Sequence, residues 1–254
     1  MKLASRIVIC TLAAFAVSSC ARTKVNWIPV SETAHFAFFT PSGTEDAVPL
    51  LADELEANYD RITDDLQVAP DQKFPVYVFG DVGTYHQALG PDAPAASVGT
   101  VQGTDIWIVS PLKPSGTLDT QTMVTAGVHE FVHALVNYIN GSLDKNNYLI
   151  PIWLNEGLAG YEAGQMTPDW RARITQRVAD EAIPSISSDL VPDRFDQVGG
   201  LAFSITLVEY MIEEYGFDKI IAIIKAPSEM EATLGITTSE LDSAWREYLR
   251  ETYQ

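Results

Sequence analysis

The feature that most constrains the fold is a pair of histidines four residues apart within a long helical pattern. His129 and His133 enclose Glu130 in the segment HEFVH. Residues four apart lie one above the other on an α-helix, so both imidazoles project to one side and can bind one metal ion. Apolar residues at spacings of three and four extend this helix over 118–139. We therefore expect a helix that packs on a core along one face and presents two metal ligands along another.

Glu130 points in a different direction from the two histidines. At 3.6 residues per turn it lies about 100° round the helix from His129 and about 300° from His133. Its carboxylate can thus flank a metal ion without binding it, where a general base must stand to deprotonate a zinc-bound water. We predict Glu130 as a catalytic residue. The alternative is two surface histidines that bind no metal.

A zinc site of this type needs a third protein ligand. The other two histidines, His35 and His86, lie upstream of the motif, so an acid is favoured. Glu156 lies downstream, beyond a loop rich in Asn, Gly and Lys that lets a second helix run back antiparallel to the first. Glu162 is the rival ligand, but it lies about 240° round the same helix and points elsewhere. We predict one zinc ion per chain, held by the histidine pair and Glu156.

The order of the predicted elements indicates an α+β fold, because strands come first and helices later. The patterns predict strands at 35–40, 74–79, 98–101 and 104–109, the last two forming a hairpin. They predict helices at 44–66, 81–89, 118–139, 151–161 and 200–215, one capped by Thr167, and a last one opened by a Thr237/Glu240 capping box.

The motifs of this sequence resemble those of a known enzyme family. HEFVH followed by WLNEGLA is similar to the gluzincin zinc peptidases, in particular their peptidase-MA-like branch. The likeness is strong at these two motifs and diffuse over the rest of 35–249. It implies that His129, His133 and Glu156 bind zinc and that Glu130 is the catalytic acid/base. The metzincin class is excluded, because the position of its third histidine holds Ile139.

The resemblance also implies a zincin-like fold and a peptide substrate. We expect a small, mostly antiparallel sheet with an edge strand beside the motif helix. By its place in the chain, segment 104–109 resembles the edge strand on which such enzymes lay out an extended peptide or protein substrate. The alternative is that this segment fills the core. Many relatives carry a tyrosine that stabilises the oxyanion, where this chain has Leu201 and Phe203.

Three functions are compatible with the sequence. The favoured one is zinc-dependent hydrolysis of peptide bonds. A second is a non-catalytic zinc-binding or scaffold protein on the same fold, and a third is a hydrolase of another substrate class. A nucleic-acid partner is not expected, because 34 acidic against 16 basic residues give a net charge of −18.

The first residues have the pattern of an export signal. Lys2 and Arg6 precede an apolar run that is too short to span a bilayer. The segment VSSC, ending at Cys20, resembles the lipobox of bacterial lipoproteins, in which the cysteine becomes lipidated. Ala21 then implies transfer to the periplasmic face of the outer membrane. The alternative is a plain signal peptide with a chance cysteine.

We therefore expect a signal peptide over 1–19 and a single domain over 20–254. Within that domain we expect an N-terminal α/β lobe at about 30–140 and a helical lobe at about 150–254.

Overall fold

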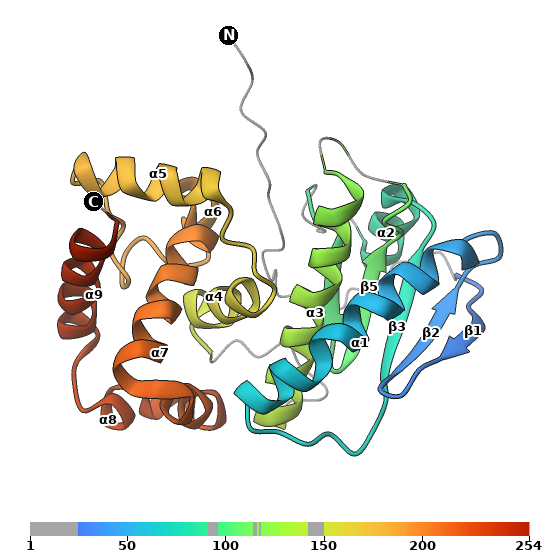
Figure 1. The fold of residues 1–254 in the computed structure, drawn as a ribbon, viewed down its shortest axis with the longest axis horizontal. Helices are drawn as coiled ribbons and strands as arrows, with labels where there is room; N and C mark the ends of the chain where they lie inside the picture. The colour runs from blue at the N-terminus through green and yellow to red at the C-terminus, as the bar shows by residue number, and fades with distance from the viewer. Residues whose placement is uncertain (1–24, 91–95, 114–115, 117, 142–149, 254) are drawn as a thin grey trace, which may run out of the picture. The chain divides into compact units, whose positions relative to one another are not determined.

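A computed structural model describes residues 25–90, 96–113, 116, 118–141 and 150–253. The chain divides into two compact units (Figure 1). The sheet unit comprises Met1–Asp64 and Val68–Asn146, and the helical unit comprises Asp65–Gln67 and Asn147–Gln254. Cys20 lies outside the described residues. Among those that are described, no helix combines the length and the apolar character needed to cross a bilayer.

The sheet unit is built on five strands in the order β1-β2-β3-β5-β4. Strands β1, β2, β3 and β5 are labelled in Figure 1. Their bounds are β1 Ile28–Glu32, β2 Phe36–Thr40, β3 Phe74–Phe79, β4 Gly99–Gln102 and β5 Asp105–Val109. The β1/β2 and β4/β5 pairs are antiparallel, whereas β2/β3 and β3/β5 are parallel. The α+β class is thus confirmed, but the expectation of a mostly antiparallel sheet is wrong, because the sheet is mixed.

The helical connections explain the mixed sheet. The chain passes from β2 to β3 through the short helix η1, Glu45–Ala47, and α1, Val48–Asp65, while α2, Val82–Leu89, follows β3. The crossover through α1 returns the chain in the same direction, so β2 and β3 are parallel. Helix α2 leads to β4, which runs opposite to β3, and the β4/β5 hairpin reverses the chain again, so β5 is parallel to β3. The predicted hairpin of β4 and β5 is present, but β5 lies between β3 and β4. The edge strands are therefore β1 and β4, with β4 at the edge next to β5, and the assignment of 104–109 as an edge strand is corrected.

One face of the sheet packs against α1 and the motif helix α3, Thr120–Asn140 (Figure 1). Alternate side chains of β2 and β3, Phe36, Phe38, Phe74, Val76 and Val78, are fully buried. Phe131 of α3 meets this layer edge-on, with ring centroids 5.0 Å from Phe36 and 5.3 Å from Phe74. The motif helix is thereby held by aromatic packing on the side opposite to its ligands.

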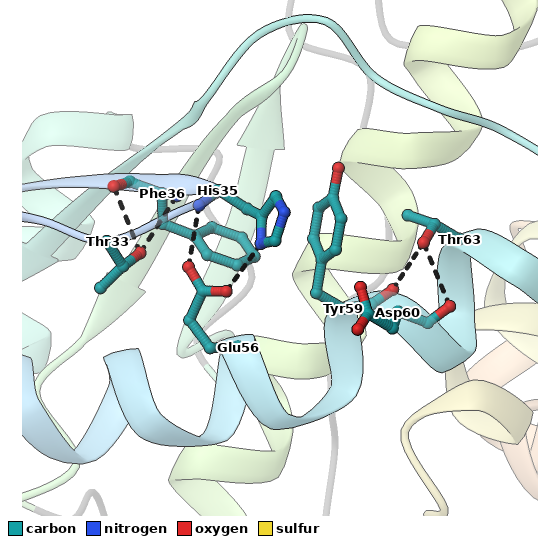
Figure 2. A network of polar contacts seen from close by, with 7 residues as sticks. All are labelled: Thr33, His35, Phe36, Glu56, Tyr59, Asp60 and Thr63. Atoms are coloured by element: carbon teal, nitrogen blue, oxygen red, sulfur yellow. Dashed lines mark hydrogen bonds and ion pairs between the residues drawn. The ribbon is translucent and has the colours of Figure 1, made fainter.

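A polar network ties α1 to the entry of β2 (Figure 2). The backbone N–H of His35 donates to one Glu56 carboxylate oxygen at 2.8 Å, and the His35 ring nitrogen Nδ1 lies 2.7 Å from the other. The His35 ring stacks on Tyr59 at 3.5 Å, and Tyr59 stacks on Phe131 at 5.6 Å. His35 is therefore a structural residue that supports the motif helix.

The helical unit is organised around one long helix. Its elements are α4 Ile152–Glu162, α5 Pro168–Ala179, α6 Phe195–Val198, α7 Gly200–Lys225, η2 Pro227–Glu229, α8 Met230–Leu234 and α9 Thr238–Thr252. The Thr167 cap and the Thr237/Glu240 capping box form as predicted. The helix predicted over 200–215 ends as expected, because Gly216 adopts φ 75° and ψ 168°, which are not helical. A second helical segment follows this kink and carries α7 on to Lys225.

Candidate metal centre

The motif helix α3 places its two histidines side by side in the interior. The helix begins at the Asp119 cap, which accepts from Thr122 N–H, and ends at a left-handed Gly141. His129 is 0% and His133 is 2% exposed, so neither is a surface residue. Their Nε2 atoms lie 3.0 Å apart and their rings are nearly perpendicular, at 86°.

This separation fits a shared ion. Two imidazole nitrogens at about 2.0–2.1 Å from a tetrahedral zinc lie about 3.3 Å from each other. Neutral imidazole nitrogens are also ligands that zinc prefers. The histidine pair can therefore supply two positions of a zinc site with little change in the helix.

Glu130 is also buried, at 1% exposed, and it lies against the edge strand. A Cβ atom built on Gly99 of β4 would lie 2.8 Å from both Cγ and Oε1 of Glu130 and 2.9 Å from Ile108 Cδ1. Real Cβ atoms do not approach this closely, so only glycine leaves room for the Glu130 side chain. Gly99 was not singled out in the sequence, although a glycine inside a strand is a known signal of close approach.

Gly99→Ala is expected to disturb Glu130 more than the fold. The added methyl group must displace the Glu130 carboxylate or move β4, and overpacking of this kind typically costs about 1–3 kcal/mol of stability. We expect the variant to fold with a lowered melting temperature. On the prediction from the sequence that Glu130 is a general base, we also expect a loss of at least about tenfold in hydrolytic rate, since misplacement of such a group by about 1 Å can cost far more. Melting curves and peptide-cleavage rates, measured with zinc content, check this. A fully active variant would show that Gly99 does not position Glu130.

Two further contacts hold α3 against the β4/β5 hairpin. The Asn137 side-chain amide donates to the Gly103 carbonyl in the turn at 2.8 Å. Ile106 and Ile108 of β5 are fully buried beneath the helix, as the core interpretation of this segment expected. The edge strand is therefore fixed to the motif helix at its turn as well as at Gly99.

Glu156 lies on α4 of the helical unit and is 0% exposed, so it is not a solvent-facing helix acid. Its position is set by a close approach of α4 to α7. A Cβ atom on Gly157 would overlap the Ser204 carbonyl, and one on Gly160 would lie 2.7 Å from Ile205 Cδ1. The two glycines were not recognised in the sequence, although their spacing puts both on one face of the helix.

The negative charge of Glu156 affects the pKa of a neighbouring carboxyl group, Asp196, in the same unit. The pKa of Asp196 is raised, first by the burial of that carboxyl and then by the negative charge of Glu156. Glu162 is 2% exposed and thus also buried. Burial alone therefore does not decide whether Glu156 or Glu162 is the third ligand. The distinction between them rests on their direction around α4.

Leu201 and Phe203, which stand where many of the resembling peptidases carry a tyrosine, belong to the core. Leu201 and Phe203 are 9% and 2% exposed, and the Phe203 ring lies 6.1 Å from Trp245. The Arg177 guanidinium stands 5.3 Å above the same ring. Neither position offers a hydrogen-bond donor, so the structure assigns no oxyanion-stabilising residue there.

Comparisons with known proteins agree with the geometry. A sequence model described as Peptidase MA superfamily matches residues 61–251, which include the motif helix and Glu156. No curated protein and no solved structure matches the chain significantly.

Proposed function

The chain belongs to the Peptidase MA superfamily, and we propose that it hydrolyses peptide bonds with one zinc ion held by His129, His133 and Glu156. The observation that carries this proposal is the buried histidine pair, with Nε2 atoms 3.0 Å apart, beside an equally buried Glu130. Each of these three side chains, His129, His133 and Glu156, is buried, and together they are a candidate ligand set for one metal ion. Two imidazoles and a carboxylate are the ligand set of catalytic zinc in peptidases.

The protein residues then have separate roles in the reaction. When bound, zinc supplies Lewis acidity, which polarises a carbonyl and makes a water more acidic. Glu130 accepts the proton of the attacking water on its carboxylate and later delivers it to the leaving amine. Gly99 leaves the space that this carboxylate occupies. We propose that the extended peptide pairs with β4, the edge strand next to Glu130, because backbone hydrogen bonds give affinity for any sequence.

Metal dependence tests the proposal directly. Wild-type protein is expected to cleave peptides in a broad library, to lose this activity on treatment with a zinc chelator, and to regain it when zinc is added back. Mass spectrometry of the digest identifies the products. Wild-type protein with full zinc content that cleaves nothing in such a library would instead favour a non-catalytic zinc protein on the same fold.

We also propose that the protein is exported and anchored by lipid at Cys20, on the periplasmic face of the outer membrane. The support is the charged, then apolar, segment before VSSC, together with Ala21. Cys20→Ser is expected to release the protein from the membrane fraction, because stable anchoring takes two or more acyl chains at about 0.8 kcal/mol per buried methylene. Fractionation of cells that express either form shows the difference. Wild-type protein found wholly in the soluble periplasm would contradict the anchor.

A further inference from the structure

A chain of buried polar contacts ties helix α2 to the start of the edge strand. The Tyr85 hydroxyl lies 2.9 Å from Ser97 Oγ, and Ser97 Oγ donates to the Gly99 carbonyl at 2.9 Å. The His86 Nε2 atom lies 3.0 Å from the Ser97 backbone carbonyl. Tyr85 is 0% and Ser97 is 3% exposed, so water does not compete for the contact between their hydroxyls.

The direction of the Gly99 backbone follows from the register of the hairpin. Gly99 pairs with Ile108, and the Val109 N–H donates to the Val98 carbonyl at 2.8 Å. Hydrogen-bonded and non-hydrogen-bonded pairs alternate in an antiparallel ladder. Val98 and Val109 form a hydrogen-bonded pair, so Gly99 belongs to a non-hydrogen-bonded one. Its N–H and carbonyl point away from β5, toward the edge on which a peptide would add.

The Gly99 carbonyl therefore accepts its hydrogen bond from the Ser97 hydroxyl on the side of β4 that points away from β5. This is the side on which a substrate strand would add. An added strand pairs with the outward-facing groups of every second residue, which here are those of Gly99 and Val101. A substrate residue opposite the Gly99 carbonyl would ordinarily have to donate its N–H. Because Ser97 already supplies a donor to this carbonyl, that requirement is relaxed at one position of the peptide.

We propose that Ser97, held by Tyr85, is a positioning and specificity-determining residue of the peptide-binding edge, and that it makes one subsite tolerant of proline. Proline is the one residue without a backbone N–H, so it is the residue whose acceptance depends on an already satisfied carbonyl. The inference rests on the proposed peptidase function and deepens it. Since Gly99 also abuts Glu130, the same contact fixes β4 beside the catalytic carboxylate.

A proline scan tests the specificity. In a peptide that wild-type protein cleaves, proline is placed at each position in turn, and kcat/KM is measured for wild type, Ser97→Ala and Tyr85→Phe. At one position we expect wild type to accept proline. At that position Ser97→Ala should lower the ratio of the proline peptide to its parent by about three- to tenfold, the usual worth of one hydrogen bond. Tyr85→Phe should act in the same direction and less strongly.

Thr40→Val is the matched control, because it removes another buried hydroxyl from the same sheet. Within the described part of the chain the Thr40 hydroxyl makes no hydrogen bond. This variant should leave the proline ratio at every position unchanged. A change in Thr40→Val equal to that in Ser97→Ala would overturn the proposal, since the effect would then be one of general stability. An unchanged ratio in Ser97→Ala would overturn it as well.

Amide hydrogen exchange provides a readout that needs no activity. Ser97→Ala should accelerate exchange in β4, at the amides of Thr100 and Gln102 that face β5, by about threefold or more relative to the amides of β5, whereas Thr40→Val should not. A wild type that cleaves nothing would count against the peptidase function, and exchange would still test the tie to Gly99. Unchanged exchange in an active Ser97→Ala variant would overturn this inference and leave the peptidase function standing.

Discussion

Glu130→Gln is expected to keep zinc near the wild-type content and to lower peptide hydrolysis by about a hundredfold to ten-thousandfold. The substitution preserves the size of the side chain and removes only its capacity to accept a proton. The side chain is 1% exposed and packed against Gly99, so an isosteric amide can occupy the same space. Because Glu130 is not proposed as a ligand, the metal should remain. Single-turnover or steady-state cleavage, measured alongside metal content, gives both quantities on one preparation.

Glu32→Gln supplies the matched control for this experiment. It makes the same chemical change in the same unit, at a side chain that is 67% exposed and paired with Lys73 on the surface. Surface ion pairs contribute little to stability, so this variant should behave as wild type. A Glu130→Gln variant that cuts as fast as its parent would remove Glu130 from the mechanism. A slow wild type would not, since one oxyanion donor is worth about a hundredfold or more and Leu201 and Phe203 provide none.

The local elements of this fold could be predicted from the sequence because their signals are local. The spacing of apolar residues predicted the motif helix, which runs over Thr120–Asn140, close to the expected 118–139. Residues typical of helix caps predicted the starts of α5 and α9. The turn residues Gln102 and Gly103 predicted the β4/β5 hairpin. Each of these depends on residues within a few positions of each other.

Strand pairing could not be predicted in the same way, because it joins residues far apart in the chain. Nothing within 104–109 indicates that β3 takes one side of this strand, so the segment was placed at the edge where β4 lies. Strand β1, Ile28–Glu32, was missed because its burial is incomplete and its pattern weak. Gly99 and Gly157 were missed for a related reason: the atoms that forbid a Cβ there belong to other elements, Glu130 in one case and Ser204 in the other.

The two histidines were the part of the proposed site that could be predicted best from the sequence. The i, i+4 spacing of His129 and His133 fixes their relation within one helix, and the structure places their Nε2 atoms 3.0 Å apart. The choice of Glu156 over Glu162 depends on the direction of each side chain around α4, and both are buried. The third ligand therefore calls for a direct measurement of metal binding.

That measurement compares zinc binding by wild type, His133→Ala, Glu156→Gln and Glu162→Gln. The two glutamine variants form a matched pair, because each replaces a buried carboxylate of the same helix by a neutral group of equal size. Circular dichroism and melting curves establish that each is folded. Zinc content of the purified protein and competition with a chelator give the stoichiometry and the affinity.

We predict one zinc per wild-type chain, and a loss of affinity of more than about a hundredfold in both Glu156→Gln and His133→Ala, since even residues that only orient ligands are worth about 10- to 100-fold. Glu162→Gln should bind zinc as wild type does. Normal binding by Glu156→Gln together with weak binding by Glu162→Gln would show that Glu162 is the third ligand. Wild-type protein without zinc affinity would contradict the metal centre altogether.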